Sequence, residues 1–107
     1  MKGYQLEFFT QENKRHGGRH LGEWLLELAR SQGIRGATLF MGTKGYGHGG
    51  RIHSAHFFEI ADQPVEVTMI VGEEEADRLF DLLRQEQVRV FYVKSPVEFG
   101  TLGEEGS

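Results

Sequence analysis

The chain has 107 residues, of which 38% are apolar, so it is long enough for one domain with its own hydrophobic core. It contains no cysteine, which excludes disulfides, thiolate metal sites and cysteine nucleophiles. Twelve basic and sixteen acidic residues give a formal charge of −4, which argues against a nucleic-acid-binding role. The first residues form no apolar signal region, and no apolar run approaches the ~18 residues of a membrane span. We therefore expect a soluble, cytoplasmic protein.

The N-terminal part of the chain carries patterns of two strands and one helix. Residues 4–9 alternate apolar and polar side chains, which predicts a half-buried strand. The polar residues 10–18 are expected to form a loop. Apolar residues then recur at helical spacing, with Gly33 placed to end the helix in a left-handed conformation. Residues 37–41 predict a second strand. The helical stripe, expected in the core, comprises Leu21, Trp24, Leu25, Leu28 and Ala29.

Residues 42–50 stand out because they hold five glycines in nine positions. So much glycine makes regular structure costly, and we expect a mobile or tightly bent loop. A long loop of this kind inside a compact domain is usually functional. Residues 52–60 are expected to be extended, with a turn at residues 62–64.

The C-terminal part repeats the order of strand, helix and strand. Residues 65–71 alternate and are rich in β-branched side chains, which predicts a strand. The acidic residues 73–75 open the next helix, where the helix dipole favours negative charge. Residues 88–93 predict the last strand, which we expect to stop before Pro96. The apolar stripe of the helix comprises Ala76, Leu79, Phe80 and Leu83.

This order predicts an α+β, ferredoxin-like βαββαβ fold. The fold has a four-stranded antiparallel sheet with two helices on one face, and the glycine-rich loop lies between its second and third strands. We expect a single domain over residues 1–98 and a flexible acidic tail over residues 99–107. Several strands carry apolar residues on both faces, among them Phe9, Phe91 and Val93. Another subunit is the simplest cover for the second face.

Short glycine-containing motifs occur in a series along the chain: Gly17-Gly18-Arg19-His20-Leu21, Gly36-Ala37-Thr38, Gly45-Tyr46-Gly47-His48 and Arg51-Ile52-His53-Ser54-Ala55. In this order, on a βαββαβ layout, they resemble a family catalogued as domain of unknown function 190, which is regarded as PII-like. A strand that runs into Lys-Gly-aromatic-Gly is also similar to the start of the T-loop in PII signalling proteins. The resemblance covers about residues 3–98.

The resemblance implies a non-enzymatic regulator that forms a homotrimer with ligand clefts between its subunits. In PII relatives these clefts bind adenine nucleotides, so AMP, ADP, ATP or a small anion is the expected effector. The flexible loop of PII relatives docks onto a membrane transporter or an enzyme. In this chain the loop offers backbone N–H groups and three basic side chains that suit an anion. The expected ligand-binding residues are Lys44, Gly45, Tyr46, Gly47, His48 and Arg51.

Three departures from the PII pattern narrow the expected ligand. PII proteins cradle phosphates with a glycine- and lysine-rich loop before the last strand, whereas residues 84–88 contain no glycine here. Residues 99–101 stand where PII proteins carry paired arginines. Gly49 replaces the glutamine that supports Mg²⁺ and 2-oxoglutarate. Binding of 2-oxoglutarate is therefore not expected, and a smaller nucleotide or anion is favoured over ATP.

Two alternatives remain from the sequence. A trimeric metal-binding protein of the CutA type has the same fold and uses histidines, of which this chain has five: His16, His20, His48, His53 and His56. On a strand His53 and His56 point to opposite faces, so they cannot share a metal within one chain, and we assign no metal site. The second alternative is a small enzyme with His48 or His53 as general base. No Ser-His-Asp order or nucleophile elbow supports it.

Overall fold

The structure is a computed structural model that describes residues 1–42, 44–46, 52–54 and 63–103. Its main elements follow the predicted order of strand, helix and strand, repeated twice. They are β1 (Lys2–Gln11), α1 (Leu21–Ser31), β4 (Ala37–Met41), β7 (Pro64–Gly72), α2 (Glu73–Gln85) and β8 (Phe91–Glu98). Short strands β2 (Arg15–His16), β3 (Arg19–His20), β5 (Lys44–Tyr46) and β6 (Ile52–Ser54) form two small hairpins.

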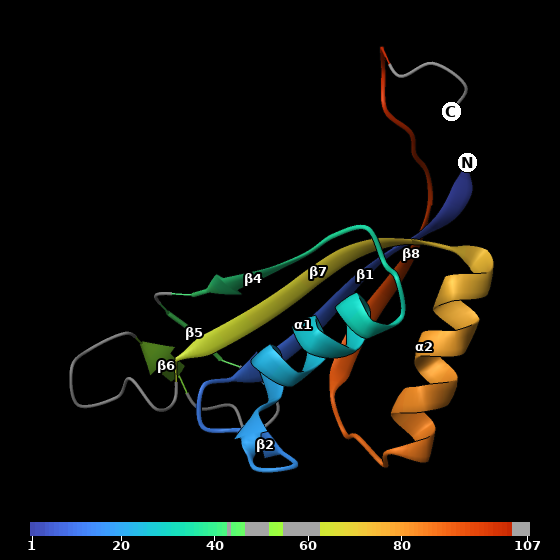
Figure 1. The fold of residues 1–107 in the computed structure, drawn as a ribbon. Coiled ribbons are helices and arrows are strands. Elements are labelled where there is room, and N and C mark those ends of the chain that lie inside the picture. The colour runs from blue at the N-terminus through green and yellow to red at the C-terminus, as the bar shows by residue number, and fades with distance from the viewer. Residues whose placement is uncertain (43, 47–51, 55–62, 104–107) are drawn as a thin grey trace.

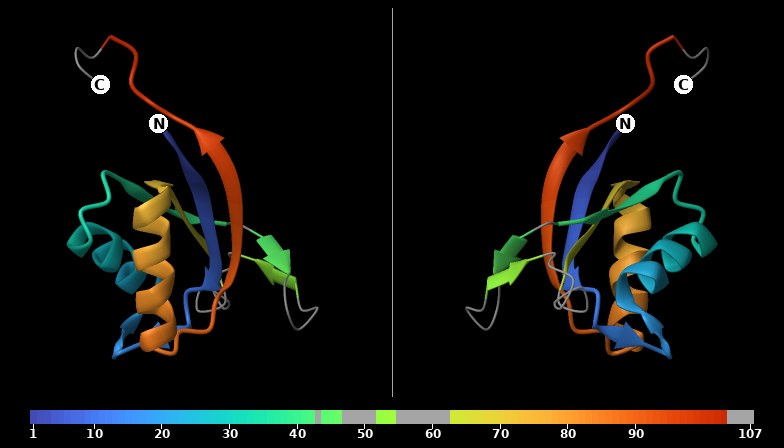
Figure 2. Two further views of the ribbon diagram at one scale, coloured as in Figure 1. Left: turned by 90° about the vertical axis from the view of Figure 1, so that its right-hand side faces the viewer. Right: turned by 90° about the vertical axis from the view of Figure 1, so that its left-hand side faces the viewer.

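The main sheet has four antiparallel strands in the order β4-β7-β1-β8. Both helices (Figure 1) lie on one face of this sheet, and the turned views of Figure 2 show the β5–β6 hairpin on the side of the other face, which no described helix covers and which we call the open face. Helix α1 packs on β4 and β7, and α2 packs on β1 and β7. The predicted ferredoxin-like βαββαβ fold is confirmed.

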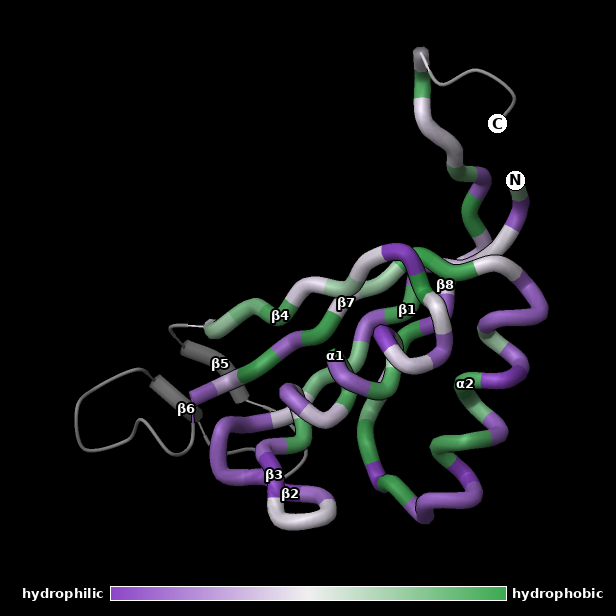
Figure 3. Tube along the Cα trace, in the orientation of Figure 1, coloured by the Kyte–Doolittle hydropathy of each residue, from purple (hydrophilic) through white to green (hydrophobic). Residues whose placement is uncertain are grey.

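The core lies between the two central strands and the helices. Alternate side chains of β1 and β7 are fully or almost fully buried because every second residue points to the helices. Figure 3 shows the matching alternation of hydrophobic and hydrophilic residues along β7. The buried residues include Leu6, Phe8, Leu25, Ala29, Val67, Met69, Val71, Ala76 and Leu79.

The ends of both helices follow from local chemistry. Gly33 has φ 76°, the left-handed conformation expected where α1 ends. At the start of α2, the backbone N–H of Gly72 donates a hydrogen bond of 2.8 Å to Glu75 Oε1. This reciprocal bond is half of a capping box and satisfies a backbone donor that the helix leaves free. The interpretation of residues 73–75 as helix-start charges is confirmed.

The prediction of a loop over residues 10–18 was wrong. Strand β1 continues through Gln11, and β2 pairs with β3 across the two-residue turn Gly17-Gly18. Both glycines have a positive φ, 58° and 79°. The tight two-residue turn that matches the twist of a hairpin requires a positive φ at both of its central positions. The Gly-Gly pair was therefore a hairpin signal in an otherwise polar segment.

The predicted bounds of the last strand were also wrong. Strand β8 begins at Phe91, and it continues through Pro96 to Glu98. Since β8 is an edge strand, it tolerates a residue without an N–H donor. Trp24 differs from its expected place in the core as well: it is half-buried, and its ring packs on the ring of His16 with centroids 4.3 Å apart.

The segment after α2 contains one strained backbone position. Gln87 has φ 55°, and in the described chain it is the only residue other than glycine with a positive φ. We expect Gln87→Gly to raise the free energy of unfolding by about 0.5–1 kcal/mol, because glycine adopts this conformation without a Cβ clash. Urea unfolding at fixed protein concentration measures the change. Gln85→Gly, at the end of α2, is the matched control and should be destabilising by about 0.5–1 kcal/mol. Destabilisation by both variants would contradict the strain.

Candidate functional site

The predicted ligand loop begins and ends in a short hairpin. The backbone of β5 pairs antiparallel with that of β6, in the register Lys44↔Ser54, Gly45↔His53 and Tyr46↔Ile52. Part of the segment expected as loop is thus a strand, and β6 covers the first residues of the segment expected to be extended. The other predicted ligand residues, Gly47, His48 and Arg51, lie outside the described residues.

The base of this hairpin is fixed to one end of the main sheet. Gly42 directly follows β4, and its N–H donates a 2.7 Å hydrogen bond to the carbonyl oxygen of Pro64, the first residue of β7. Next to it, the N–H of Glu12 bonds the carbonyl oxygen of Gln63 at 2.9 Å. The chain therefore leaves and re-enters the sheet at one point, beside the end of β1.

A row of aromatic side chains crosses the open face at the same end of the sheet. The register pairs Phe40 with Glu66, Glu66 with Phe9, and Phe9 with Phe91, so these four residues form one line from edge to edge. We call Phe40, Phe9 and Phe91 the aromatic row. They are 52%, 38% and 71% exposed, and the rings of Phe9 and Phe91 lie 5.8 Å apart. Exposed aromatic groups on this scale indicate a surface that another molecule covers.

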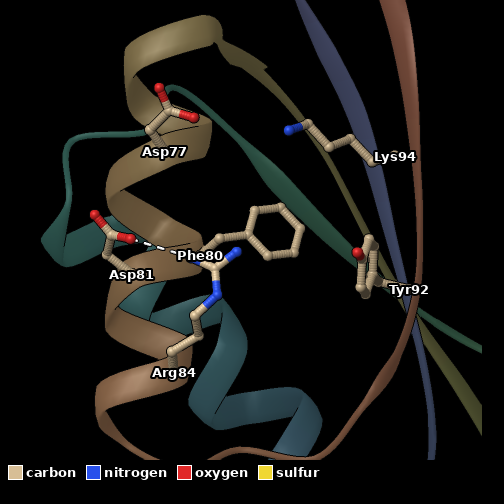
Figure 4. Close-up of a pocket in the computed structure, with 6 residues that line it drawn as sticks. All are labelled: Asp77, Phe80, Asp81, Arg84, Tyr92 and Lys94. Atoms are coloured by element: carbon tan, nitrogen blue, oxygen red, sulfur yellow. Dashed lines mark hydrogen bonds and ion pairs between the residues drawn. The ribbon is translucent and has the colours of Figure 1, made fainter.

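A groove lies on the opposite side of β8, between this strand and α2. It has a volume of about 320 Å³, and Figure 4 shows its lining side chains. Phe80 from α2 meets Tyr92 from β8 edge-to-face, with ring centroids 4.9 Å apart. The ammonium group of Lys94 lies 4.2 Å from the centre of the Tyr4 ring. We call this space the α2–β8 groove; it is lined by Asp77, Phe80, Asp81, Arg84, Tyr92 and Lys94.

A second hollow of about 340 Å³ lies at the start of α2 and is acidic. Glu73 lines it, and the first turn of α2 carries three glutamates in all. These carboxylates counter the partial positive charge of the helix N-terminus, which an anionic ligand would otherwise use. The lining is completed by Lys2, Gly3, Tyr4, Pro96, Val97 and Glu98.

The described histidine side chains have structural partners. His16 Nε2 lies 3.2 Å from Glu86 Oε1, which joins the β2–β3 hairpin to the end of α2. His20 Nδ1 donates a 2.7 Å hydrogen bond to the carbonyl oxygen of Glu12. Within residues 1–42 and 63–103, whose side chains the structure describes, no three His, Asp or Glu side chains are placed to hold a metal ion. His48 and His56 lie outside these ranges.

The α2–β8 groove was not predicted from the sequence. The expected strand ended at Val93, so Lys94 lay outside it, whereas β8 continues to Glu98. With the observed bounds, Tyr92 and Lys94 alternate onto the helix side, opposite Phe8 and Leu6 of β1. The signal was therefore present as period-two spacing, and the treatment of Pro96 as a stop concealed it.

The architecture belongs to a recognisable class of proteins. It is similar to CPII, a nitrogen regulatory PII-like protein from Thiomonas intermedia K12 whose structure holds ADP, AMP and bicarbonate: the TM-score is 0.69, at 18% identity over 94% of this chain and 91% of that chain. It is also similar to a putative PII-like signaling protein from Thermus thermophilus, with a TM-score of 0.66 at 20% identity over 91% and 88%. The fold is therefore PII-like.

Sequence comparison then gives the family. Residues 3–98 match the model of DUF190, described as "Uncharacterized ACR", and the chain belongs to this family. A UPF0166 protein from Aquifex aeolicus (strain VF5) is 32% identical over 97 residues, which cover 82% of this chain and 92% of that protein. In the described part of the chain, neither helix is long and apolar enough to cross a membrane.

Proposed function

We propose that this protein is a PII-like regulator, not an enzyme, which binds an adenine nucleotide or a small anion in clefts between the subunits of a homotrimer. The observation that carries the proposal is the glycine-rich insertion at one end of a PII-like sheet, held at its base by the bond from Gly42 to Pro64. CPII, which shares the fold, was crystallised with ADP, AMP and bicarbonate.

The proposed mechanism is ordering of the loop by the ligand. Lys44, His48 and Arg51 supply positive charge, and the glycines let backbone N–H groups approach an anion closely. Because Gly42 and Pro64, which flank the inserted segment, are hydrogen-bonded to each other, a ligand that fixes the loop changes the surface presented at this end of the sheet. A membrane transporter or an enzyme that recognises the ordered loop is the regulated partner.

The open face of the sheet is the proposed trimer interface. It presents the aromatic row together with Ile70 and Val93, which are 38% and 37% exposed. When other copies of the chain cover this face, each Å² of apolar surface that is removed from water stabilises the assembly by about 25 cal/mol. The row ends beside the base of the loop, so a neighbouring subunit at this face lies next to the proposed ligand cleft.

A thermal-shift series tests the ligand. We expect AMP or ADP to raise the melting temperature, since a ligand at a hundred times its dissociation constant adds about 2.7 kcal/mol to the stability of the folded state. Lys44→Ala and Gly47→Pro should abolish the shift while the oligomer persists. Lys2→Ala, at the opposite end of β1 from the insertion, is the matched control and should respond like the parent protein. A shift with Cu²⁺ or Zn²⁺ alone would instead favour the CutA-like alternative.

Neighbouring aromatic residues of β8 test the interface. Phe91 and Tyr92 are both exposed, but Phe91 lies on the open face and Tyr92 on the helix side. We expect Phe91→Ser to shift the protein from trimer to monomer in light scattering after size-exclusion chromatography. Tyr92→Ser removes a comparable ring and should leave the trimer intact. An equal loss of trimer in both variants would contradict an interface on the open face.

A further inference from the structure

The α2–β8 groove exists because α2 does not cover the edge of the sheet. The helix packs mainly on β1 and β7, and it meets the facing side of β8 through the rings of Phe80 and Tyr92. Tyr92 is 49% exposed although its cross-strand partner Phe8 is fully buried. A space with aromatic walls is thus open to solvent beside the core.

The two walls of the groove carry opposite charges that do not neutralise each other. On the α2 wall, Arg84 Nη1 pairs with Asp81 Oδ1 at 3.1 Å. The carboxylate of Asp77 is therefore the unpaired charge of this wall. On the β8 wall, Lys94 lies over the rings of Tyr4 and Phe80, at 4.2 and 5.5 Å. Within the described chain, neither Asp77 nor Lys94 has an ion-pair partner. Figure 4 shows Lys94 extended from β8 toward the helix that bears Asp77.

The charges and aromatic rings that line the groove determine which class of ligand fits it. The unpaired carboxylate of Asp77 disfavours a nucleotide or another multivalent anion, and the unpaired ammonium group of Lys94 disfavours a metal ion. The formal charge of the lining is zero, with one unpaired group of each sign on facing walls. A small molecule that carries both charges is complementary to both walls, and aromatic rings between them suit an apolar middle.

We propose that the α2–β8 groove binds a free α-amino acid with an apolar side chain. Its carboxylate faces Lys94, its ammonium group faces Asp77, and its side chain packs on Phe80 and Tyr92. The volume of about 320 Å³ lies at the lower end of ligand sites and suits a molecule of this size. The bound amino acid adds contacts between α2 and β8 to the ring contact of Phe80 and Tyr92.

Calorimetric titration of the full chain with L-phenylalanine and L-leucine tests the proposal. Phenethylamine lacks the carboxylate and 3-phenylpropionate lacks the ammonium group, so each keeps only one of the two charges. We expect the amino acids to bind about two- to fivefold more tightly than either analogue. Lys94→Met and Asp77→Asn should each lower the amino-acid affinity by a similar factor. Lys14→Met and Glu74→Gln, which change charge elsewhere on the surface, should not.

Three outcomes would overturn this assignment: no heat at about 10 mM amino acid, equal affinity for the singly charged analogues, or unchanged affinity in both groove variants. Competition by AMP would identify the groove with the nucleotide site and would also overturn it. The result is separable from the nucleotide proposal, because Lys44→Ala should leave amino-acid binding intact, and Lys94→Met should leave the thermal shift with nucleotide intact.

Discussion

The fold depends on the burial of alternate side chains from β1 and β7 under the two helices. These central strands point Leu6, Phe8, Val67 and Met69 into one core, and each of these side chains is at most 2% exposed. Two helices cover only one face of a four-stranded sheet, so the opposite face and the helix side of β8 are left over. Both surfaces to which we assign a role follow from this single constraint, the open face as an interface and the α2–β8 groove as a ligand site.

The sequence predicted those parts of the fold that depend on periodicity. Residues 37–41 form β4 as expected, and the two apolar stripes place α1 and α2. It failed where a local exception outweighed the pattern: Gly17-Gly18 turns a polar segment into a hairpin, and Pro96 is accepted inside an edge strand. Pattern reasoning treats both glycine and proline as breaks, whereas the geometry of a tight turn and of a sheet edge accommodates them.

The two candidate sites differ in how much of each could be predicted from the sequence. The resemblance to PII proteins located the loop, and the structure adds the bonds that hold its base, but Gly47, His48 and Arg51 lie outside the described residues. The period-two spacing of β8 could have placed Tyr92 and Lys94 on the helix side, but the other wall of the α2–β8 groove depends on where α2 rests on the sheet. Helical spacing determines which face of α2 is buried, and it does not determine which strands lie beneath that face.

Glu66 affects the tendency of the chain to aggregate while the open face of its sheet is exposed. It stands in the middle of the aromatic row, between Phe40 and Phe9, and is half-buried there. An uninterrupted stripe of exposed rings would favour unspecific aggregation of chains that are not yet assembled. One carboxylate in the stripe acts as a gatekeeper, since it must be desolvated whenever another apolar surface stacks on the row. In the proposed trimer, Glu66 would therefore lower the affinity between subunits and lengthen the lifetime of the unassembled chain.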